Sequence, residues 1–578
     1  MLCAVSAFAG DLTDRFDRTL GRVLDGDGPR YDAELLLADL EDDGSRLFAD
    51  FTGDLSGRFL GATATAGRAD PRAAARAAEL IEGILSRQRD DGGFGRRLDY
   101  DSVEREHMAQ LWGLGRLLVG LVEFAQANGD DRSRSAAMRL GDYLAGLGPR
   151  LNRQDVRQRA DGSWLAHGYG CWTQNIEGLA ALGRLSGETR YLDAARAVVP
   201  FSDGFEGEHS HGRLSTLRGI LALAELNGHT ALVERVENAW ETLAASGRIR
   251  LSGAVAEYLE PNPTRDEGCS NADWLRLSLA LWRQTKDLRY LEAAERSYFN
   301  GFLANQFPKG DFGHRSFAER GLRAGGVRAW WCCTLHGLRA FSAVSAAAFD
   351  ADDDALSYVL PVDGEGARGG LRVRSESTLS TDGTVRLIVL EAPAAAATIR
   401  VRRPRWVTAV RVSREGEEVD GFVRVRRRWK TSDELRIEYE LAAGEVRDGR
   451  GGFALTLGPS LLGVDQLTTP AYFGQPYDQV RLLAPATDTA GRVGLSAGFS
   501  VAAYPSQPGQ ARLTAWGDSA GEFRRDYRFY RPGEDPPRAS LLQRVQRRTW
   551  FPFAAGGLLG VLLGAGAVLL LRRRSRPA

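Results

Sequence analysis

Apolar residues recur at intervals of three and four positions over most of residues 12–349. Residues 72–88 and 110–126 show the spacing clearly, and it is the spacing of one buried face of an α-helix. Polar turns that begin near Asn128, Ser186, Asn227 and Gln284 separate the helical stretches. The pattern therefore predicts a series of helical hairpins joined by short turns.

The hairpins are related to one another in sequence. Residues 190–196 read RYLDAAR and residues 289–295 read RYLEAAE, each just after a polar turn. One hairpin cannot bury its apolar face alone, so such copies must stack. This length holds about six hairpins, and an even ring of them can close on itself. We expect residues 12–349 to form an (α/α)6 barrel; stacking follows from the repeats, and closure is the further expectation.

The hydrophobic period changes near residue 350. Residues 371–374, 385–389, 399–402 and 422–426 alternate apolar with charged side chains, as half-buried strands do. We expect a β-sandwich domain over residues 350–443 and a second β-rich domain over residues 444–532. Prolines at positions 532, 536 and 537 then indicate a linker over residues 533–549.

The clearest single segment is the uncharged stretch of residues 550–571. It has the ~20 apolar residues that cross a bilayer, with Trp550 at one edge and a basic tail, residues 572–578, at the other. The fold class is therefore α+β and multidomain: a helical barrel, β-sandwich domains and one C-terminal transmembrane helix. The lipid bilayer is one expected partner, and Gly556, Gly560 and Gly564 favour a homodimer through close helix packing.

Residues 1–11 resemble the end of a secretory signal, because a short apolar run leads to Ala7, Phe8 and Ala9. No basic residues precede this run, so a signal with a misplaced start codon and no signal at all both remain open. We expect a single-pass membrane protein with its body outside the cytoplasm and its arginine-rich tail inside.

Charge is balanced, with 75 basic and 75 acidic residues. Nucleic-acid binding would need a basic excess or a dense basic stripe, so no nucleic-acid partner is expected. The basic run over residues 424–430 alternates with valines and is typical of the solvated face of a strand.

Candidate chemistry centres on the five cysteines, which are too few and too unevenly spaced for a disulfide framework. Cys332 and Cys333 are adjacent, and Glu267 and Cys269 lie upstream in the same helical region. Three thiols and a carboxylate suit a tetrahedral zinc site, and a metal would keep the thiols in the nucleophilic thiolate form. The spacing alone leaves buried structural cysteines open, and that is the expected state of Cys171.

The chain resembles the β-L-arabinofuranosidases of glycoside hydrolase family 127 over roughly residues 50–470. Glu267 and Cys269 followed by Cys332 and Cys333 match the family's arrangement, and residues 252–257 (SGAVAE) are similar to its run ending in the acid/base glutamate. The β half carries further matches in the family's order: residues 403–406, 421–423, 428–430 and 454–459.

The resemblance implies a fold, a cofactor and residue roles. The family fold is an (α/α)6 barrel with β domains, and a zinc-bound cysteine is its nucleophile. Carried over, the zinc ligands are Glu267, Cys269, Cys332 and Cys333. Cys332 would attack the anomeric carbon and Glu257 would be the acid/base, with Glu260 as the alternative acid. Such a pair retains the anomeric configuration through a covalent intermediate.

The chain departs from the family in the sugar pocket. The three histidine positions of the family align with Arg116, Thr173 and Ser215, whereas neighbouring features remain at Gln110, Glu177 and Arg218. His209 and His211 lie near the third position and either replace a histidine or lie on the solvated surface, which we favour. Trp331 either stacks on sugar or packs in the core. A pocket with different donors should select a different sugar.

The leading hypothesis is a retaining glycosidase acting on a furanose or related sugar, with a carbohydrate as the substrate partner. Two alternatives remain. One is a membrane-anchored, non-catalytic carbohydrate-binding or scaffold protein that kept the barrel. The other is a cyclase-like α-toroid, favoured by the turn over residues 88–95 and a Cys-His pair but not by the β half.

Overall fold

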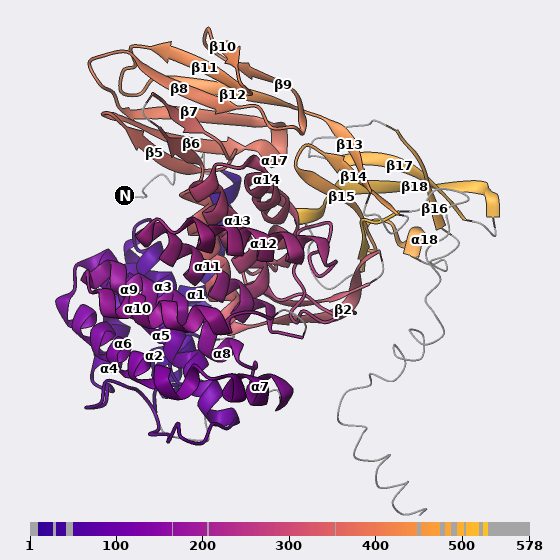
Figure 1. Ribbon diagram of the computed structural model, residues 1–578. Coiled ribbons are helices and arrows are strands. Elements are labelled where there is room, and N and C mark those ends of the chain that lie inside the picture. The colour runs from indigo at the N-terminus through magenta and orange to yellow at the C-terminus, as the bar shows by residue number, and fades with distance from the viewer. Residues whose placement is uncertain are drawn as a thin grey trace, which may run out of the picture.

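The computed structural model describes residues 10–529, apart from gaps at 27–29, 42–49, 164–165, 205–206, 319, 353, 448–451, 474–479, 487–493, 502–503 and 519–523. A helical domain is followed by two β domains, which confirms the predicted order (Figure 1). The signal-like segment with Cys3 and residues 533–578, with the predicted linker, membrane helix, glycines and basic tail, lie outside the described residues.

Six inner helices form a closed ring in the described part of the helical domain: each packs on the next, and α16 packs back on α3. In ring order they are α3 (Asp54–Ala66), α5 (Arg105–Asn128), α9 (Asn175–Ser186), α11 (Ser210–Asn227), α13 (Gly268–Thr285) and α16 (Trp331–Ser345). Because each outer helix returns the chain, all six inner helices run in one direction and their N-termini share one end of the ring.

An outer helix covers each inner helix. The outer helices are α4 (Pro71–Leu85), α6 (Asp131–Leu151), α10 (Thr189–Val198), α12 (Thr230–Ala245), α14 (Leu288–Arg296) and α1 (Asp11–Asp25). α1 is the outer partner of α16, so the first described helix completes the last hairpin. The related segments at 190–196 and 289–295 fall on α10 and α14, where Tyr191 and Tyr290 are fully buried.

The polar turns end their helices by a shared geometry. Gly129, Gly187 and Gly228 follow inner helices in the left-handed backbone conformation, and Lys286 does the same with φ of 58°. A left-handed residue after the last turn lets the chain reverse and satisfies free carbonyl groups. The remaining short helical segments are α2 (Ala33–Ala38), α7 (Gln154–Ser163), α8 (Gly170–Thr173), η1 (Val199–Phe201), η2 (Ser297–Phe302), α15 (Leu303–Asn305), α17 (Leu379–Asp382), α18 (Pro470–Phe473) and η3 (Trp516–Asp518).

Helix α5 is the only helix in the described part of the chain with the length and apolar composition of a membrane span. Of its most apolar window, 94% is buried inside the protein. It is therefore one of the buried inner helices of the ring.

Two five-stranded sheets stack to form the middle domain (Figure 1). One has the order β10 (Glu417–Val419), β11 (Phe422–Arg427), β8 (Ala397–Arg402), β4 (Leu356–Tyr358), β3 (Phe349–Ala351). The other has the order β5 (Gly364–Arg368), β6 (Leu371–Thr378), β7 (Thr384–Glu391), β12 (Glu434–Leu441), β9 (Val407–Val412). Alternation places apolar residues inside: Val385 pairs with Ile437 and Leu387 with Leu435, all buried. The basic run also alternates as predicted, with Arg424 and Arg426 exposed on β11.

A third sheet joins the helical domain to the C-terminal β domain. Its main path runs β1 (Gly313–Phe317), β2 (Gly321–Ala329), β19 (Arg525–Asp526), β15 (Ser460–Asp465), β18 (Tyr504–Ala515), β17 (Gly494–Val501), β16 (Val480–Ala486), and β13 (Ala443–Arg447) and β14 (Phe453–Leu457) extend from β15. The hairpin β1–β2 lies within the region predicted to be helical. Its sequence lacks strand alternation, and its pairing partner β19 lies about 200 residues further along the chain.

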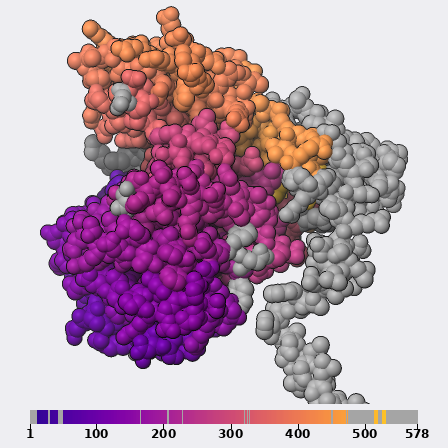
Figure 2. Space-filling model, in the orientation of Figure 1, coloured from indigo at the N-terminus to yellow at the C-terminus, as the bar shows by residue number. Residues whose placement is uncertain are grey.

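The helical and middle domains share one continuous hydrophobic core. Figure 2 shows the middle domain resting directly on the magenta part of the helical domain. Buried Arg402 of β8 pairs with buried Glu295 of α14 across this boundary. Thr13 of α1 also hydrogen-bonds Asp363. The middle domain therefore contacts the helical ring along its outer helices α14 and α1.

Candidate active site

The candidate site lies at the end of the ring where the inner helices begin. Glu267 is the residue before α13, with Cys269 in its first turn, and Cys332 and Cys333 are in the first turn of α16. The strand β2 leads directly into α16, and the backbone of Asp266 pairs with Arg315 of β1. The hairpin and the loop before α13 thus fix both ligand-bearing segments at one rim.

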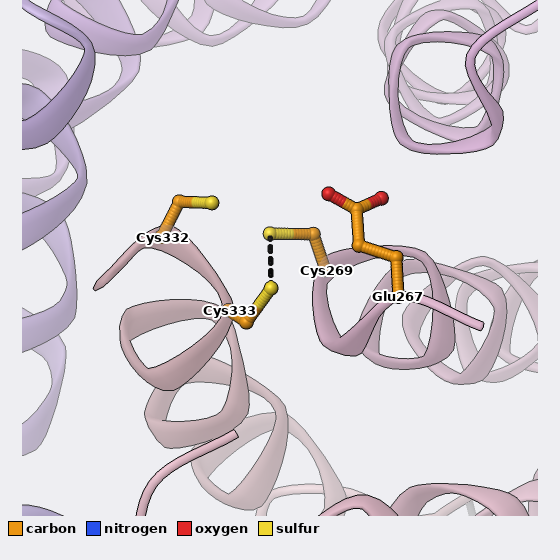
Figure 3. A group of neighbouring side chains, drawn as sticks. All are labelled: Glu267, Cys269, Cys332 and Cys333. Atoms are coloured by element: carbon orange, nitrogen blue, oxygen red, sulfur yellow. Dashed lines mark hydrogen bonds between the residues drawn. The ribbon is translucent and has the colours of Figure 1, made fainter. Parts of the chain in front are cut away.

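The structure brings the four residues together: one ligand atom from each lies within 4.8 Å of the others. Figure 3 shows the side chains converging between the first turns of α13 and α16. The Sγ atoms of Cys269 and Cys333 lie 3.7 Å apart in a hydrogen bond. Glu267, Cys269 and Cys333 are buried, whereas Cys332 is partly exposed. Cys332 is therefore the member of the four whose residue is partly exposed.

Electrostatics distinguish Cys332 from its neighbours. Hydrogen bonds from Cys269 and Cys333 lower the pKa of Cys332 well below its ordinary value, and the Arg58 guanidinium adds to this. Burial raises the pKa of Cys269 and of Cys333. Helix N-termini also favour thiolates. Cys332 is the thiol that ionises first.

The pKa of Glu267 is raised by burial, then by the charge of Cys332 and by Glu257. A buried carboxyl beside thiolates is unfavourable as an anion unless a cation joins them. The donor set of three sulfurs and one oxygen matches tetrahedral zinc coordination. These residues therefore fit a zinc ion by the chemistry of their donors.

Glu257 lies on the same rim and is mostly buried: its backbone nitrogen donates to Arg265, and Ala256 pairs with Asp266, the residue before Glu267. Arg265 holds its carboxylate in two hydrogen bonds, one of them 2.8 Å long between Nη2 and Oε1. His314 Nδ1 lies 3.9 Å from Glu257 Oε2. Glu260 is exposed, and its backbone carbonyl accepts a hydrogen bond from Arg248.

Three predicted substrate-binding residues form an ion-pair group deeper in the ring. Arg116 Nη1 lies 3.2 Å from Glu177 Oε2, and Arg218 Nη2 lies 2.9 Å from Glu177 Oε1. Both arginines lower the pKa of the partly buried Glu177 carboxyl to about 2, against the effect of desolvation. Ser215 also accepts a hydrogen bond from Arg116.

Gln110 and Trp331 point to other parts of the rim. Gln110 is buried, accepts a hydrogen bond from Tyr100 and donates one to the backbone of Arg96. Trp331 is partly exposed, donates from Nε1 to the backbone of Arg30, and packs edge-to-face on Trp330.

The preference for solvated histidines at positions 209 and 211 is wrong. His209 is 5% exposed and His211 is 1% exposed. His209 Nε2 lies 3.5 Å from Glu267, and His211 is bonded to Asp273 and Arg58. They are buried because α11 is an inner helix whose first turn faces the ring interior. Cys171 is buried, as predicted, and burial raises its pKa to about 12.

Sequence reasoning missed a second layer of residues one helical turn below the sulfurs. It consists of Arg58, His211, Asp273 and His336. Of these, only His211 is a candidate site residue in the sequence analysis. Asp273 follows Cys269 by four positions, and His336 follows Cys332 by four. Residues four apart share a helix face, so this spacing could have identified both once the helices were assigned.

Comparisons with known proteins agree with this geometry. A family model described as the GH127 catalytic domain of β-L-arabinofuranosidase matches residues 47–346, and one described as the GH127 middle domain matches residues 362–441. A search of curated proteins found no match.

Solved structures show the same fold over nearly the whole chain. Ara127N, a GH127 β-L-arabinofuranosidase from Geobacillus stearothermophilus T6, is 16% identical with a TM-score of 0.69, over 92% of this chain and 100% of its own. BT3674, a GH127 β-arabinofuranosidase, is 14% identical with a TM-score of 0.68, over 91% of this chain and 96% of its own.

These matches include the middle β domain, which the α-toroid alternative leaves unexplained. The catalytic-domain match also spans all four converging residues. The chain belongs to the GH127 β-L-arabinofuranosidase family and is a glycoside hydrolase.

Proposed function

We propose that the protein is a retaining glycosidase of the β-L-arabinofuranosidase type, with Cys332 as nucleophile and Glu257 as acid/base. One observation carries the proposal: three sulfurs and a carboxylate converge at the beginning of two inner helices, and one of the cysteines, Cys332, is partly exposed. A separate carboxyl group, Glu257, lies on the same rim.

Glu267, Cys269, Cys332 and Cys333 would hold a zinc ion. When bound, zinc supplies positive charge that keeps the thiols deprotonated and moderates their reactivity. The buried residues Cys269, Cys333 and Glu267 anchor the ion. Cys332 differs from them by its exposure and by its lowered pKa.

In the first step the Cys332 thiolate attacks the anomeric carbon, and a carbon–sulfur bond forms as the glycosidic carbon–oxygen bond breaks. Glu257 gives its proton to the leaving oxygen. In the second step Glu257 takes a proton from water, whose oxygen attacks the same carbon and releases Cys332 as thiolate. Two inversions give net retention.

The pairing of Glu257 with Arg265 must open before the carboxyl group can reach the glycosidic oxygen. The Arg265 side chain is 49% exposed, whereas that of Glu257 is 10% exposed. The guanidinium can therefore move to solvent while Glu257 stays in place. We infer that binding of the sugar displaces Arg265.

The substrate sugar is a furanose or a related ring, since the solved relatives are arabinofuranosidases. The positions that align with the family's histidines carry Arg116, Thr173 and Ser215. Arg116 donates to Glu177 and to Ser215. Donors held in ion pairs recognise hydroxyl groups differently from free imidazoles. We therefore expect a preference that differs from that of the solved relatives.

The test uses aryl furanosides and two variants. Cys332→Ser should abolish turnover, and Glu257→Gln should slow it by about 10²–10⁴-fold for substrates with poor leaving groups. Mass spectrometry of acid-quenched Glu257→Gln with an activated substrate should find a glycosyl group on Cys332. NMR of the first product should show the anomer of the substrate.

Wild-type rates in both variants would refute these roles. Zinc bound by the wild-type protein without turnover of any furanoside or pyranoside in a broad panel would favour the alternative, a non-catalytic carbohydrate-binding protein.

A further inference from the structure

The layer below the sulfurs is a closed set of buried polar contacts. Arg58 Nη1 lies 2.9 Å from His211 Nε2 and 3.1 Å from His336 Nδ1. His211 Nδ1 is hydrogen-bonded to Asp273 Oδ2. All four side chains are almost fully buried, and they come from α3, α11, α13 and α16. The layer therefore links four of the inner helices at one depth.

His211, Asp273 and His336 alone have the composition of a metal site, and their ligand atoms lie within 4.8 Å of one another. The positions that a metal would take are already held by guanidinium groups. Arg58 faces both imidazoles, and Arg218 Nη1 lies 2.6 Å from Asp273 Oδ1. A divalent cation would be repelled by these fixed charges. The resident cation of this layer is Arg58.

Arg58 is held by a carboxylate of its own helix and also reaches one of the sulfurs. Asp54, one turn earlier on α3, accepts from Arg58 at 2.8 Å, and Trp112 Nε1 donates to the same carboxylate oxygen at 3.0 Å. Arg58 Nη1 lies 3.9 Å from Cys269 Sγ. A guanidinium keeps its charge when buried, so this contact places a permanent cation beside the ligand cluster.

We propose that Arg58 is the counter-cation of the zinc site, a positioning residue whose permanent charge offsets the excess negative charge of the ligand set. The inference rests on the proposed zinc binding. Three thiolates and one carboxylate outweigh the charge of a zinc ion by two units, and a buried excess of negative charge needs compensation. Arg58 places a cationic group 3.9 Å from the sulfur of Cys269, one of the ligands.

His211 acts through Arg58. Because Asp273 accepts at Nδ1, the proton of the neutral imidazole lies there and Nε2 is left to accept from Arg58. The imidazole thereby orients the guanidinium without adding charge, as outer-shell groups orient metal ligands.

The test measures zinc rather than turnover. Full-length holoprotein, Arg58→Met and Arg58→Lys are compared for zinc per chain, for zinc loss to a competing chelator, and for the ligand-field spectrum after cobalt substitution. Arg58→Met should lose affinity for zinc by about 10–100-fold, and Arg58→Lys, which keeps the charge, should stay within about 3-fold of wild type.

Arg402→Met is the matched control. Arg402 is also a buried arginine paired with a buried carboxylate, but it lies on β8 of the middle domain. It should lower thermal stability without changing zinc affinity. Equal zinc loss from Arg402→Met and Arg58→Met would mean that general destabilisation is the cause and would overturn the proposal.

If Arg58→Met does not fold, Asp54→Asn and His211→Gln replace it, since each removes one anchor and leaves the guanidinium. Each should weaken zinc binding several-fold, and unchanged affinity in both overturns the proposal. If the wild-type protein binds no zinc, both the proposed zinc site and this inference are refuted. A wild-type protein that binds zinc no better than Arg58→Met removes the role of Arg58 alone.

Discussion

Buried ionisable residues of this ring have partners drawn from different helices. Asp39 at the end of α2 illustrates this away from the sulfur cluster. Its Oδ2 accepts from the backbone nitrogens of Leu55 and Ser56 at 2.7 and 3.1 Å, and its Oδ1 accepts from Ser56 Oγ. It thereby caps α3, the helix that carries Arg58. Burial nevertheless raises its pKa to about 7.

This raised pKa predicts a measurable pH dependence of stability. The folded protein keeps the Asp39 proton to higher pH than the unfolded chain does, so unfolding releases it. Stability should fall as pH rises from about 4 to about 7, and the loss is complete above that. Asp39→Asn cannot ionise, and its amide can serve the same partners.

Thermal unfolding of Asp39→Asn at several pH values should therefore show a flatter profile than wild type, by about 2–4 kcal/mol over this range. Identical profiles for the two proteins would contradict the assigned protonation.

Side-chain prediction worked where the residue type itself restricts the chemistry. The cysteine pair with Glu267 and Cys269 could be recognised from sequence because few uses suit three thiols and a carboxylate. Arg58 could not be recognised in this way, because arginine side chains are mostly exposed in proteins. The sequence around Asp54 and Arg58 also has no feature that indicates that these side chains face the ring interior. His209 and His211 were misjudged for the same reason: a histidine at the start of a helix carries no sign of which end of a ring it faces.

At the scale of elements, the close contact of α3 with α5 sets the position of the cation layer. Gly57 lies against the backbone of α5: a Cβ there would come within 2.4 Å of Leu117 Cα. Backbone atoms cannot yield as a flexible side chain can. The neighbouring residue in sequence is Arg58, so the glycine determines how deep its guanidinium lies.

Gly57→Ala should therefore destabilise the protein by about 1–3 kcal/mol and also weaken zinc binding. Gly146→Ala on the outer helix α6 is the matched comparison, since nothing lies within 4 Å of a Cβ there. It should be neutral or stabilise by up to about 1 kcal/mol. Chemical denaturation measures both, and a neutral Gly57→Ala would show that the two helices can separate at no cost.

Most helices and strands could be predicted from the periodicity of apolar residues, because helices and half-buried strands each bury one face. The hairpin β1–β2 could not. Its strands gain their hydrogen bonds from the loop before α13 and from β19, so the pairing depends on tertiary contacts that local pattern cannot encode. That hairpin delivers Cys332 and Cys333, so the least predictable element positions the most recognisable motif.

At the scale of the whole molecule, attachment to a membrane remains a prediction from sequence. Residues 550–571 are long and apolar enough to span a bilayer, with arginines beyond them. Full-length protein should sediment with membranes and need detergent for release. A chain ending at residue 549 should be soluble and keep its zinc content.

Release of the full-length protein by salt or alkali would contradict a spanning helix. Crosslinking in detergent and in bilayers, with Gly560→Leu as the comparison, tests the predicted homodimer: only monomer in both would refute it.

The pairing of α1 with α16 has a consequence for biosynthesis. The first described helix cannot dock until residue 345 has left the ribosome, so about 60% of the chain must be made before the wall is complete. Until then Cys269 has no sulfur neighbours, and a thiol that waits in an unfinished interior is open to oxidants. Conditions that delay translation between Cys269 and residue 345 should therefore harm the yield of active enzyme more than its solubility.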